Sequence, residues 1–173
     1  MSEELEGGCA CGAVRYRLES RPVVTHACHC RFCQRMSGSA FAVNIMIEAD
    51  RVALLGEAPE VVPTPSTLPA GQKLHRCPRC RVALWSNHPE LGDRIAFVAA
   101  GTLDRAERVA PDVHCFTASK HPWVVLPPGV PAFAEGYDSD AVWSEEARER
   151  VAAALGSRPD RSANGVEPTR DAR

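Results

Sequence analysis

The stretch CHCRFC at residues 28–33 places three cysteines within six positions, and two shorter stretches accompany it: CAC at residues 9–11 and CPRC at residues 77–80. Seven of the eight cysteines thus fall into tight clusters, with Cys115 left over. Cysteines two positions apart make strained disulfide partners, whereas their sulfurs can share one small ion. Scattered core cysteines would not repeat these spacings three times, so the pattern predicts metal binding rather than disulfides.

Thiolate ligands favour a soft metal, which limits the choice to Zn²⁺, iron–sulfur clusters and Cu(I). Zinc is typical of Cys-x2-Cys knuckles. Four thiolates at these spacings also suit an iron–sulfur cluster, which absorbs visible light while zinc is colourless. We therefore interpret the clusters as zinc ligands.

Seven clustered ligands divide as four plus three. A closed site of four cysteines is structural, whereas three protein ligands leave one position open for water or substrate. The spacing leaves the partition open. Either residues 28–33 supply three ligands to one ion and the other two stretches enclose the second, or Cys30 and Cys33 pair with Cys77 and Cys80 as a zinc ribbon.

The composition is that of an ordinary globular domain. The chain has 173 residues, 45% of them hydrophobic and 24% charged, with a net charge of -2. These values exclude a largely disordered protein and argue against binding to nucleic acid or to an anionic membrane. No apolar run reaches the roughly 20 residues that a membrane span needs. The acidic start MSEELEGGCACG predicts no signal peptide, and hence a reducing, cytoplasmic location.

Short apolar runs bounded by glycine, proline or charge predict a mostly β fold, with strands at residues 12–18, 39–47, 52–55, 82–85 and 95–99. Four prolines predict an extended loop at 57–71. A helix is expected over 144–156, capped by Ser144, with Ala147, Val151 and Leu155 along one side. We divide the chain into a zinc domain (1–135), a helical extension (136–156) and a disordered tail (157–173).

The order of the motifs resembles the glutathione-dependent formaldehyde-activating enzyme family, whose domain centromere protein V shares. The resemblance covers about residues 5–135. It is carried by Gly8-Cys9-x-Cys11-Gly12-x-Val14-x-Tyr16, by Cys28-His29-Cys30-x-x-Cys33-Gln34-Arg35, by Cys77-x-x-Cys80, and by His114-x-Phe116 with Trp123 downstream.

This resemblance implies a tent-like fold of short antiparallel strands around two zinc ions. It implies that one structural ion is held by Cys9, Cys11, Cys77 and Cys80, and that an open catalytic ion is held by Cys28, Cys30 and Cys33. The family usually has glycine after the second knuckle, where this chain has Arg81. Because such turns often need a positive φ, we expect strain or a different turn there, with the ligands intact.

The implied activity is that of a carbon–sulfur lyase. A thiol that reaches the open zinc position would ionise and add to formaldehyde, or the reverse step would release the aldehyde from S-hydroxymethylglutathione. The expected partners are a small thiol, glutathione or a relative, and an aldehyde. Nothing in the sequence specifies an oligomeric state. The alternative is a non-catalytic zinc module that presents a partner-binding surface.

The remaining candidates surround the open centre. His114 matches the family motif and is expected to act as a proton shuttle or to make a structural hydrogen bond. Gln34 and Arg35 are candidates for orienting a glutathione carboxylate, although Arg35 could equally form a surface ion pair. Between two ligands, His29 should point away from the metal. The other assignments are Phe116 and Trp123 as core residues, Lys120 as a weaker anion contact and Cys115 as a buried free thiol.

Overall fold

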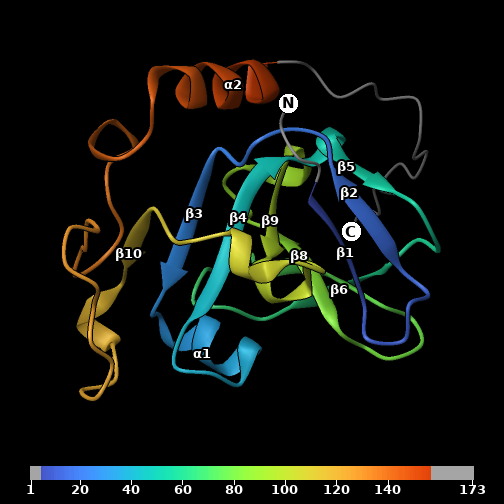
Figure 1. Cartoon of the computed structure of the whole chain (residues 1–173), viewed down its shortest axis with the longest axis horizontal. Coiled ribbons are helices and arrows are strands. Elements are labelled where there is room, and N and C mark those ends of the chain that lie inside the picture. Colours follow the sequence, from blue (N-terminus) through green and yellow to red (C-terminus); the bar gives the residue numbers. More distant parts are fainter. Residues whose placement is uncertain (1–4, 157–173) are drawn as a thin grey trace, which may run out of the picture.

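The computed structural model describes residues 5–156, which form two β-sheets and two α-helices (Figure 1). The small sheet has the order β1-β2-β5 and the large sheet the order β10-β3-β4-β9-β8-β7-β6. All pairings within these sheets are antiparallel except that of β10 with β3, which is parallel. The strands are β1 (Leu5–Gly8), β2 (Arg15–Leu18), β3 (Val24–Cys28), β4 (Ala42–Glu48), β5 (Val52–Leu54), β6 (Glu60–Thr64), β7 (Gln72–Arg76), β8 (Ala83–Asn87), β9 (Ile95–Ala99) and β10 (Val113–Cys115), and the helices are α1 (Arg31–Ser37) and α2 (Glu145–Gly156).

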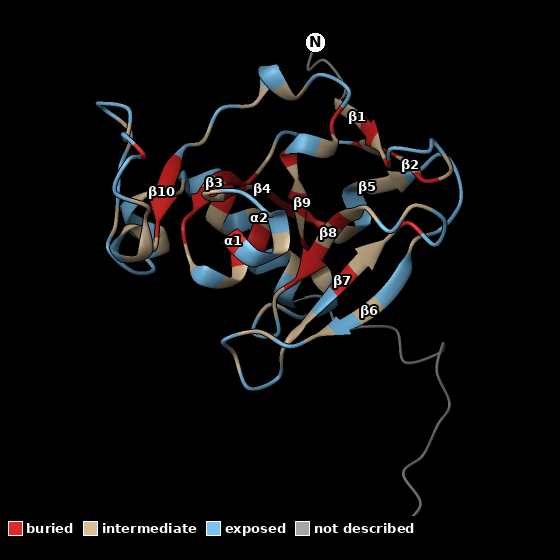
Figure 2. Ribbon diagram, turned by 90° about the horizontal axis from the view of Figure 1, so that it is seen from below, coloured by how far each residue is buried: buried red, intermediate tan, exposed pale blue. Residues whose placement is uncertain are grey.

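The main core lies between the two sheets. Tyr16 and Leu18 of the small sheet pack in one cluster with Ile45, Leu84 and Val98 of the large sheet, and all five are buried. Figure 2 shows buried residues on β10, β3, β4, β9 and β8, whereas β7 and β6 at the other edge of the large sheet are mostly intermediate or exposed. The core therefore holds the small sheet against the large one, close to the ends of β1 and β7 where two of the cysteine clusters lie.

The C-terminal helix is confirmed. The Ser144 hydroxyl accepts a hydrogen bond from the Ala147 N–H at 3.1 Å, which caps the first turn. Ala147 and Val151 are buried in a second cluster with residues of β3 and β4, whereas Leu155 is 40% exposed. The helix thus packs back on the large sheet along a shorter apolar stripe than expected.

An ion pair fastens α2 to β4. Arg150 donates from Nε and Nη2 to the carboxylate of Glu48, at 2.8 and 2.6 Å, and Glu48 is only 4% exposed. Burial by itself would raise the pKa of Glu48, but the bonds from Arg150 outweigh it and lower that pKa. The stabilisation is therefore present above the unfolded-state pKa of about 4.3 and is lost as the pH falls through the folded-state value.

We expect Arg150→Met to lower the free energy of unfolding at pH 7 by about 3 kcal/mol, because it leaves the buried carboxylate of Glu48 with only one cation, the half-exposed Arg51 at 3.4 Å. Urea denaturation measures the loss, which should shrink below pH 4. Arg148→Met is the matched control, since Arg148 lies on the same helix but pairs with the exposed Asp140, which precedes the helix. That variant should cost less than about 1 kcal/mol. Equal losses in the two variants would contradict the assignment.

The mostly β prediction is confirmed, and the predicted runs overlap β2, β4, β5, β8 and β9. The prediction of a loop over 57–71 is wrong in part, because residues 60–64 of it form β6, which includes Pro63. This strand lies at the edge of the large sheet, where the missing N–H of a proline is tolerated.

Helix α1 was not predicted. The predicted disordered tail lies outside the described residues, and the domain boundary at 135 stays a prediction. Within residues 5–156 no helix has the length and apolar character to cross a membrane.

Candidate metal centres

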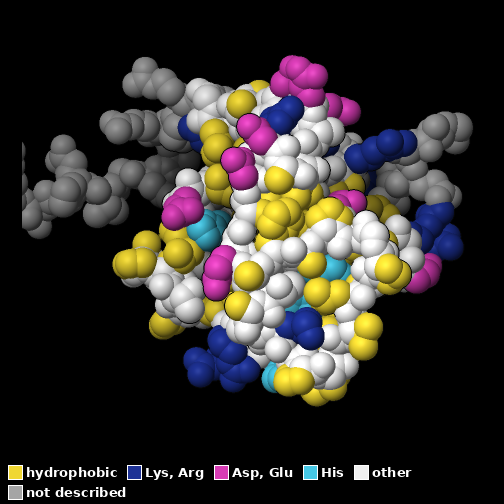
Figure 3. Space-filling model, turned by 90° about the vertical axis from the view of Figure 1, so that its left-hand side faces the viewer, with side chains coloured by type: hydrophobic (Ala, Val, Ile, Leu, Met, Phe, Trp, Pro, Cys, Tyr) yellow, Lys and Arg dark blue, Asp and Glu magenta, His cyan; other side chains and the backbone are white. Residues whose placement is uncertain are grey.

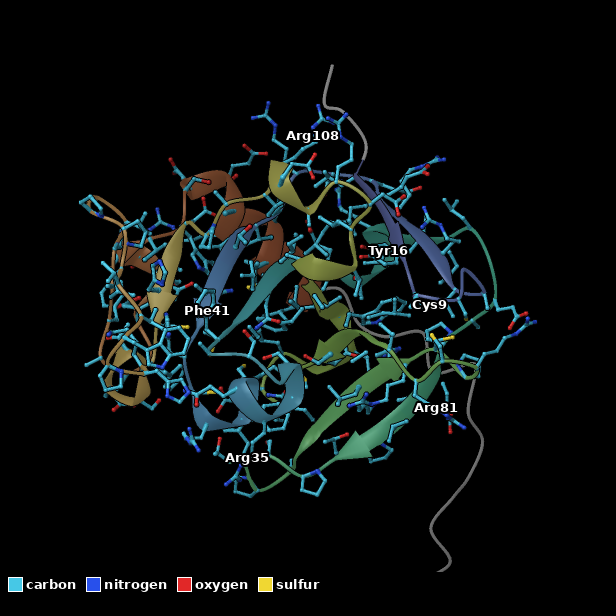
Figure 4. All side chains as sticks on the ribbon, turned by 60° about the horizontal axis from the view of Figure 1, so that its bottom comes forward. Cys9, Tyr16, Arg35, Phe41, Arg81 and Arg108 are labelled. Atoms are coloured by element: carbon cyan, nitrogen blue, oxygen red, sulfur yellow. The ribbon has the colours of Figure 1, made fainter. Side chains whose placement is uncertain are left out.

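Four cysteines from two remote turns meet at the junction of the sheets. Cys9 and Cys11 follow β1, and Cys77 and Cys80 form the knuckle after β7; the four sulfurs lie within 4.8 Å of one another. Cys9 is labelled in Figure 4 beside the end of β7. We call these four residues the four-cysteine centre. It connects the small sheet to the outer strands of the large one.

The spacing of these sulfurs suits a tetrahedral thiolate site. The Sγ atom of Cys11 lies 3.5 Å from that of Cys9 and 3.6 Å from that of Cys77. These distances are near the roughly 3.8 Å that tetrahedral zinc–sulfur bonds of about 2.3 Å imply. Burial opposes ionisation of Cys9, but the Val14 N–H and the neighbouring thiols outweigh it and lower its pKa to about 6. The donor set therefore fits zinc.

Arg81 keeps the knuckle turn that glycine usually makes. Its φ is 64°, in the left-handed region, and its N–H donates to the Cys77 carbonyl at 3.0 Å. This conformation costs a residue with a side chain about 1 kcal/mol. Its side chain forms an ion pair with Glu60 on β6. The expected strain is thus present, and the four sulfurs still converge.

A second cluster, the three-cysteine centre, forms where β3 runs into α1. Cys28 ends the strand, Cys30 caps the helix, and Cys33 lies in its first turn. Their sulfurs lie within 4.8 Å of one another, and no other potential ligand atom of the described residues joins them within that distance. The structure thus brings the seven cysteines together as four and three, and does not bring Cys30 and Cys33 to Cys77 and Cys80.

Of the three sulfurs, that of Cys28 ionises most readily, and it opposes the ionisation of the other two. The pKa of Cys28 is lowered, chiefly by hydrogen bonds from the thiols of Cys115, Cys30 and Cys33. The pKa values of Cys30 and Cys33 are raised, chiefly by Cys28, because a second thiolate beside the first is repelled. A cation among the sulfurs would remove that repulsion. Three thiolates suit zinc and leave a fourth coordination position open.

Cys115 stands beside this centre rather than in it. It pairs with Cys28 in the parallel register of β10 and β3, and it is 5% exposed. Its pKa is raised, mainly by Cys28. Cys115 therefore remains a protonated, buried thiol, as predicted, but its position next to Cys28 was not anticipated.

A buried histidine pair lies next to the centre. The Nε2 of His29 is 3.0 Å from the Nδ1 of His114, and the two rings stack at 5.3 Å. His29 is completely buried, contacts the ring of Phe41, and has no hydrogen-bond partner at Nδ1. Burial lowers the pKa of His114, so its ring is neutral at pH 7. His29 is hydrogen-bonded and does not join the sulfurs, but its pairing with His114 was missed from the sequence.

Gln34 and Arg35 differ in how far their side chains are already engaged. The Nε2 of Gln34 donates to the carbonyls of His29 and Ser119, at 2.7 and 2.9 Å, and its Oε1 accepts from Arg31. Its amide thus joins α1 to the segment after β10. Arg35 is exposed and forms no ion pair with any residue between 5 and 156, which leaves it free for a ligand.

The segment after β10 contains two residues that were predicted to lie in the core, and only one of them packs there. Phe116 packs beside the three-cysteine centre and has a φ of 57°, a strained conformation for an aromatic residue. Trp123 is 72% exposed, so its assignment to the core is wrong. Lys120 donates to the carbonyls of His121 and Val124 and thereby shapes this segment. Figure 3 views this side of the molecule, where hydrophobic side chains reach the surface.

A family model and one relative identify the family to which this chain belongs. Residues 4–119, more than half of the chain, match the family "Glutathione-dependent formaldehyde-activating enzyme". A Halomonas elongata protein named "Putative glutathione-dependent formaldehyde-activating enzyme" is 30% identical over 126 residues, covering 70% of this chain and 80% of the relative. A crystal structure of a Rhodobacter sphaeroides protein aligns with a TM-score of 0.45 and 16% identity, over 74% of this chain and 98% of the other. The chain belongs to the glutathione-dependent formaldehyde-activating enzyme family.

Proposed function

We propose that this protein is a carbon–sulfur lyase that adds the sulfur of glutathione, or of a similar thiol, to formaldehyde and catalyses the reverse step. A bond forms between sulfur and the aldehyde carbon, and the thiol proton ends on the aldehyde oxygen. The observation that carries the proposal is the three-cysteine centre, where Cys28, Cys30 and Cys33 converge without a fourth ligand from the described residues. A second zinc belongs in the closed four-cysteine centre, so the protein binds two ions.

Zinc held by three thiolates would lower the pKa of an incoming thiol and make it nucleophilic at neutral pH. The protein contributes the surroundings. Phe32, Phe116 and Tyr137 pack against the cysteine cluster and exclude water from its protein side. The free thiols that both centres require are maintained in a reducing compartment, and we place the protein in the cytoplasm.

His114 is suited to move the proton. It is neutral, is held in orientation by His29, and has no described partner at Nε2. We expect His114→Gln to lower kcat about 100-fold or more, as for loss of a general acid–base group. His121→Gln, on the neighbouring loop, is the control and should leave kcat unchanged. If His114→Gln lost zinc or thermal stability in proportion to kcat, its role would be structural.

The proposal is tested by nuclear magnetic resonance exchange between glutathione and S-hydroxymethylglutathione in the presence of formaldehyde. Zinc-loaded protein should accelerate the exchange well above the spontaneous rate, and metal-free protein should not. Two bound zinc ions without any response to thiols would instead favour a non-catalytic zinc module. The exposed Trp123 and Val125, at 72% and 88%, are the surface that such a module would present.

A further inference from the structure

Cys115 is the one cysteine that belongs to neither metal centre, and it lies beside a ligand of the open one. It ends β10 and is the register partner of Cys28, which ends β3, in the parallel pair that these two strands form (Figure 1). Register partners on neighbouring strands project their side chains from the same face of the sheet. The thiol of Cys115 is therefore held against the sulfur of Cys28.

The spacing of the two strands allows these sulfurs to form a covalent bond. Neighbouring strands lie about 4.8 Å apart, and disulfides join residues whose Cα atoms are about 4.4–6.8 Å apart. The thiols already interact, because a hydrogen bond between them lowers the pKa of Cys28 and raises that of Cys115. Cys28 and Cys30, in contrast, are only two positions apart and make strained disulfide partners.

The protein encloses Cys115 and fixes its position. Cys115 is 5% exposed, and Phe116 and Tyr137 pack against the cluster that contains it and Cys28. Its carbonyl accepts a hydrogen bond from the His29 N–H at 2.9 Å, which ties the ends of β10 and β3 together. Reaction partners held in place in this way react as if at very high concentration. Cys115 is thus placed to react with Cys28 rather than with a molecule from solution.

The reaction proposed above uses Cys28 as a zinc ligand and gives Cys115 no role. The coordination position that admits a substrate thiol is also wide enough for hydrogen peroxide, which is smaller. Peroxide oxidises thiolates rather than thiols, and the first product is a sulfenic acid. A sulfenic acid condenses with a neighbouring thiol to a disulfide, and Cys28 has such a thiol beside it that is not itself a ligand.

We propose that Cys115 is a resolving thiol, which converts the oxidation of Cys28 by hydrogen peroxide into a reversible Cys28–Cys115 disulfide and thereby empties the three-cysteine centre. Cys30 and Cys33 alone are too few ligands to retain zinc, so thiol activation stops until the disulfide is reduced. Disulfides in a reducing compartment are commonly of this transient, redox-sensing kind. The inference requires zinc in the three-cysteine centre but no particular substrate.

The two steps balance. The Cys28 thiolate attacks one oxygen of the peroxide, the O–O bond breaks, and the departing hydroxide takes up a proton to become water. The sulfur of Cys115 then attacks the sulfur of the sulfenic acid. The S–S bond forms, the S–O bond breaks, and the hydroxyl leaves with the thiol proton of Cys115 as a second water. Two electrons pass from the two sulfurs to the peroxide.

The test treats the zinc-loaded full chain with hydrogen peroxide, alkylates the remaining thiols and maps tryptic peptides by mass spectrometry. Trypsin releases residues 18–31 with Cys28, residues 32–35 with Cys33, and residues 109–120 with Cys115. We expect peptide 18–31 to be joined to 109–120, with fragmentation between His29 and Cys30 placing the bond at Cys28. Zinc should fall from two ions per chain to one. A bond between 18–31 and 32–35, or an alkylated Cys115 after zinc loss, would overturn the proposal.

Reversibility gives a second readout. Dithiothreitol and added zinc should return the oxidised protein to two zinc ions. Cys115→Ser should stay at about one, because its Cys28 is oxidised further to the sulfinic acid, which dithiothreitol does not reduce. Cys115→Ala gives the same comparison without a buried hydroxyl. Equal recovery in the variants and the unmodified protein would contradict the role of Cys115. A reversible disulfide in a protein that does not turn over glutathione would contradict only the proposed function.

Discussion

Cys77→Ser is expected to prevent stable folding, because it removes a ligand from the ion that joins the two sheets. Cys77 is completely buried, and the four-cysteine centre connects the turn after β1 with the turn after β7. Structural zinc in thiolate sites supplies about 10–16 kcal/mol of apparent binding free energy. A whole domain is stable by only about 5–15 kcal/mol. Loss of the ion therefore removes as much free energy as the fold possesses.

The measurement is a thermal melt followed by circular dichroism, with zinc counted per chain. A strong chelator should abolish the cooperative transition of the unmodified protein, and returning zinc should restore it. Cys30→Ser is the control, since it should keep one zinc and a cooperative melt. A chelated protein that retains its melting temperature would show that the four-cysteine centre does not hold the fold together.

The sequence predicted strands only where apolar residues form a continuous run or, as at residues 12–18, alternate with charged ones. β4 and β9 are continuous runs: β9 was predicted with the bounds that it has, and β4 with small errors at its ends. β7 reads QKLHR with Leu74 as its one buried residue, and it forms because both of its neighbours in the sheet pair with it. That pairing is a tertiary effect, so periodicity within β7 could not reveal it.

The candidate site could be predicted only in part for the same reason: its residues come together through tertiary contacts that sequence patterns do not reveal. The division of seven cysteines into four and three follows from counting ligands, but the choice of partition depends on two turns that lie 66 residues apart and meet only in the folded chain. The pairing of His29 with His114 spans 85 residues and depends on the parallel register of β10 and β3. Trp123 was misassigned because its size suggests burial, whereas its proline-rich segment lies at the surface.

Cys30→Ser is expected to abolish catalysis and leave the fold intact. Cys30 is the N-cap of α1, and its sulfur accepts a hydrogen bond from the Cys33 N–H at 3.4 Å. Serine is a favoured N-cap residue, so its hydroxyl can replace this bond while removing the thiolate. Zinc per chain should fall from two to one. Turnover of glutathione with formaldehyde should fall more than about 100-fold, because even residues that only orient a ligand cost 10–100-fold.

Cys115→Ser separates this prediction from a general effect of losing a buried thiol. Cys115 pairs with Cys28 across β10 and β3 but stays outside the three-cysteine centre, so its loss should preserve two zinc ions and most of the activity. Elemental analysis gives the zinc content of each variant, and the exchange assay gives its activity. If Cys115→Ser lost the second zinc as Cys30→Ser does, four cysteines would close the site. No position would then remain for a substrate thiol, and the catalytic proposal would fail.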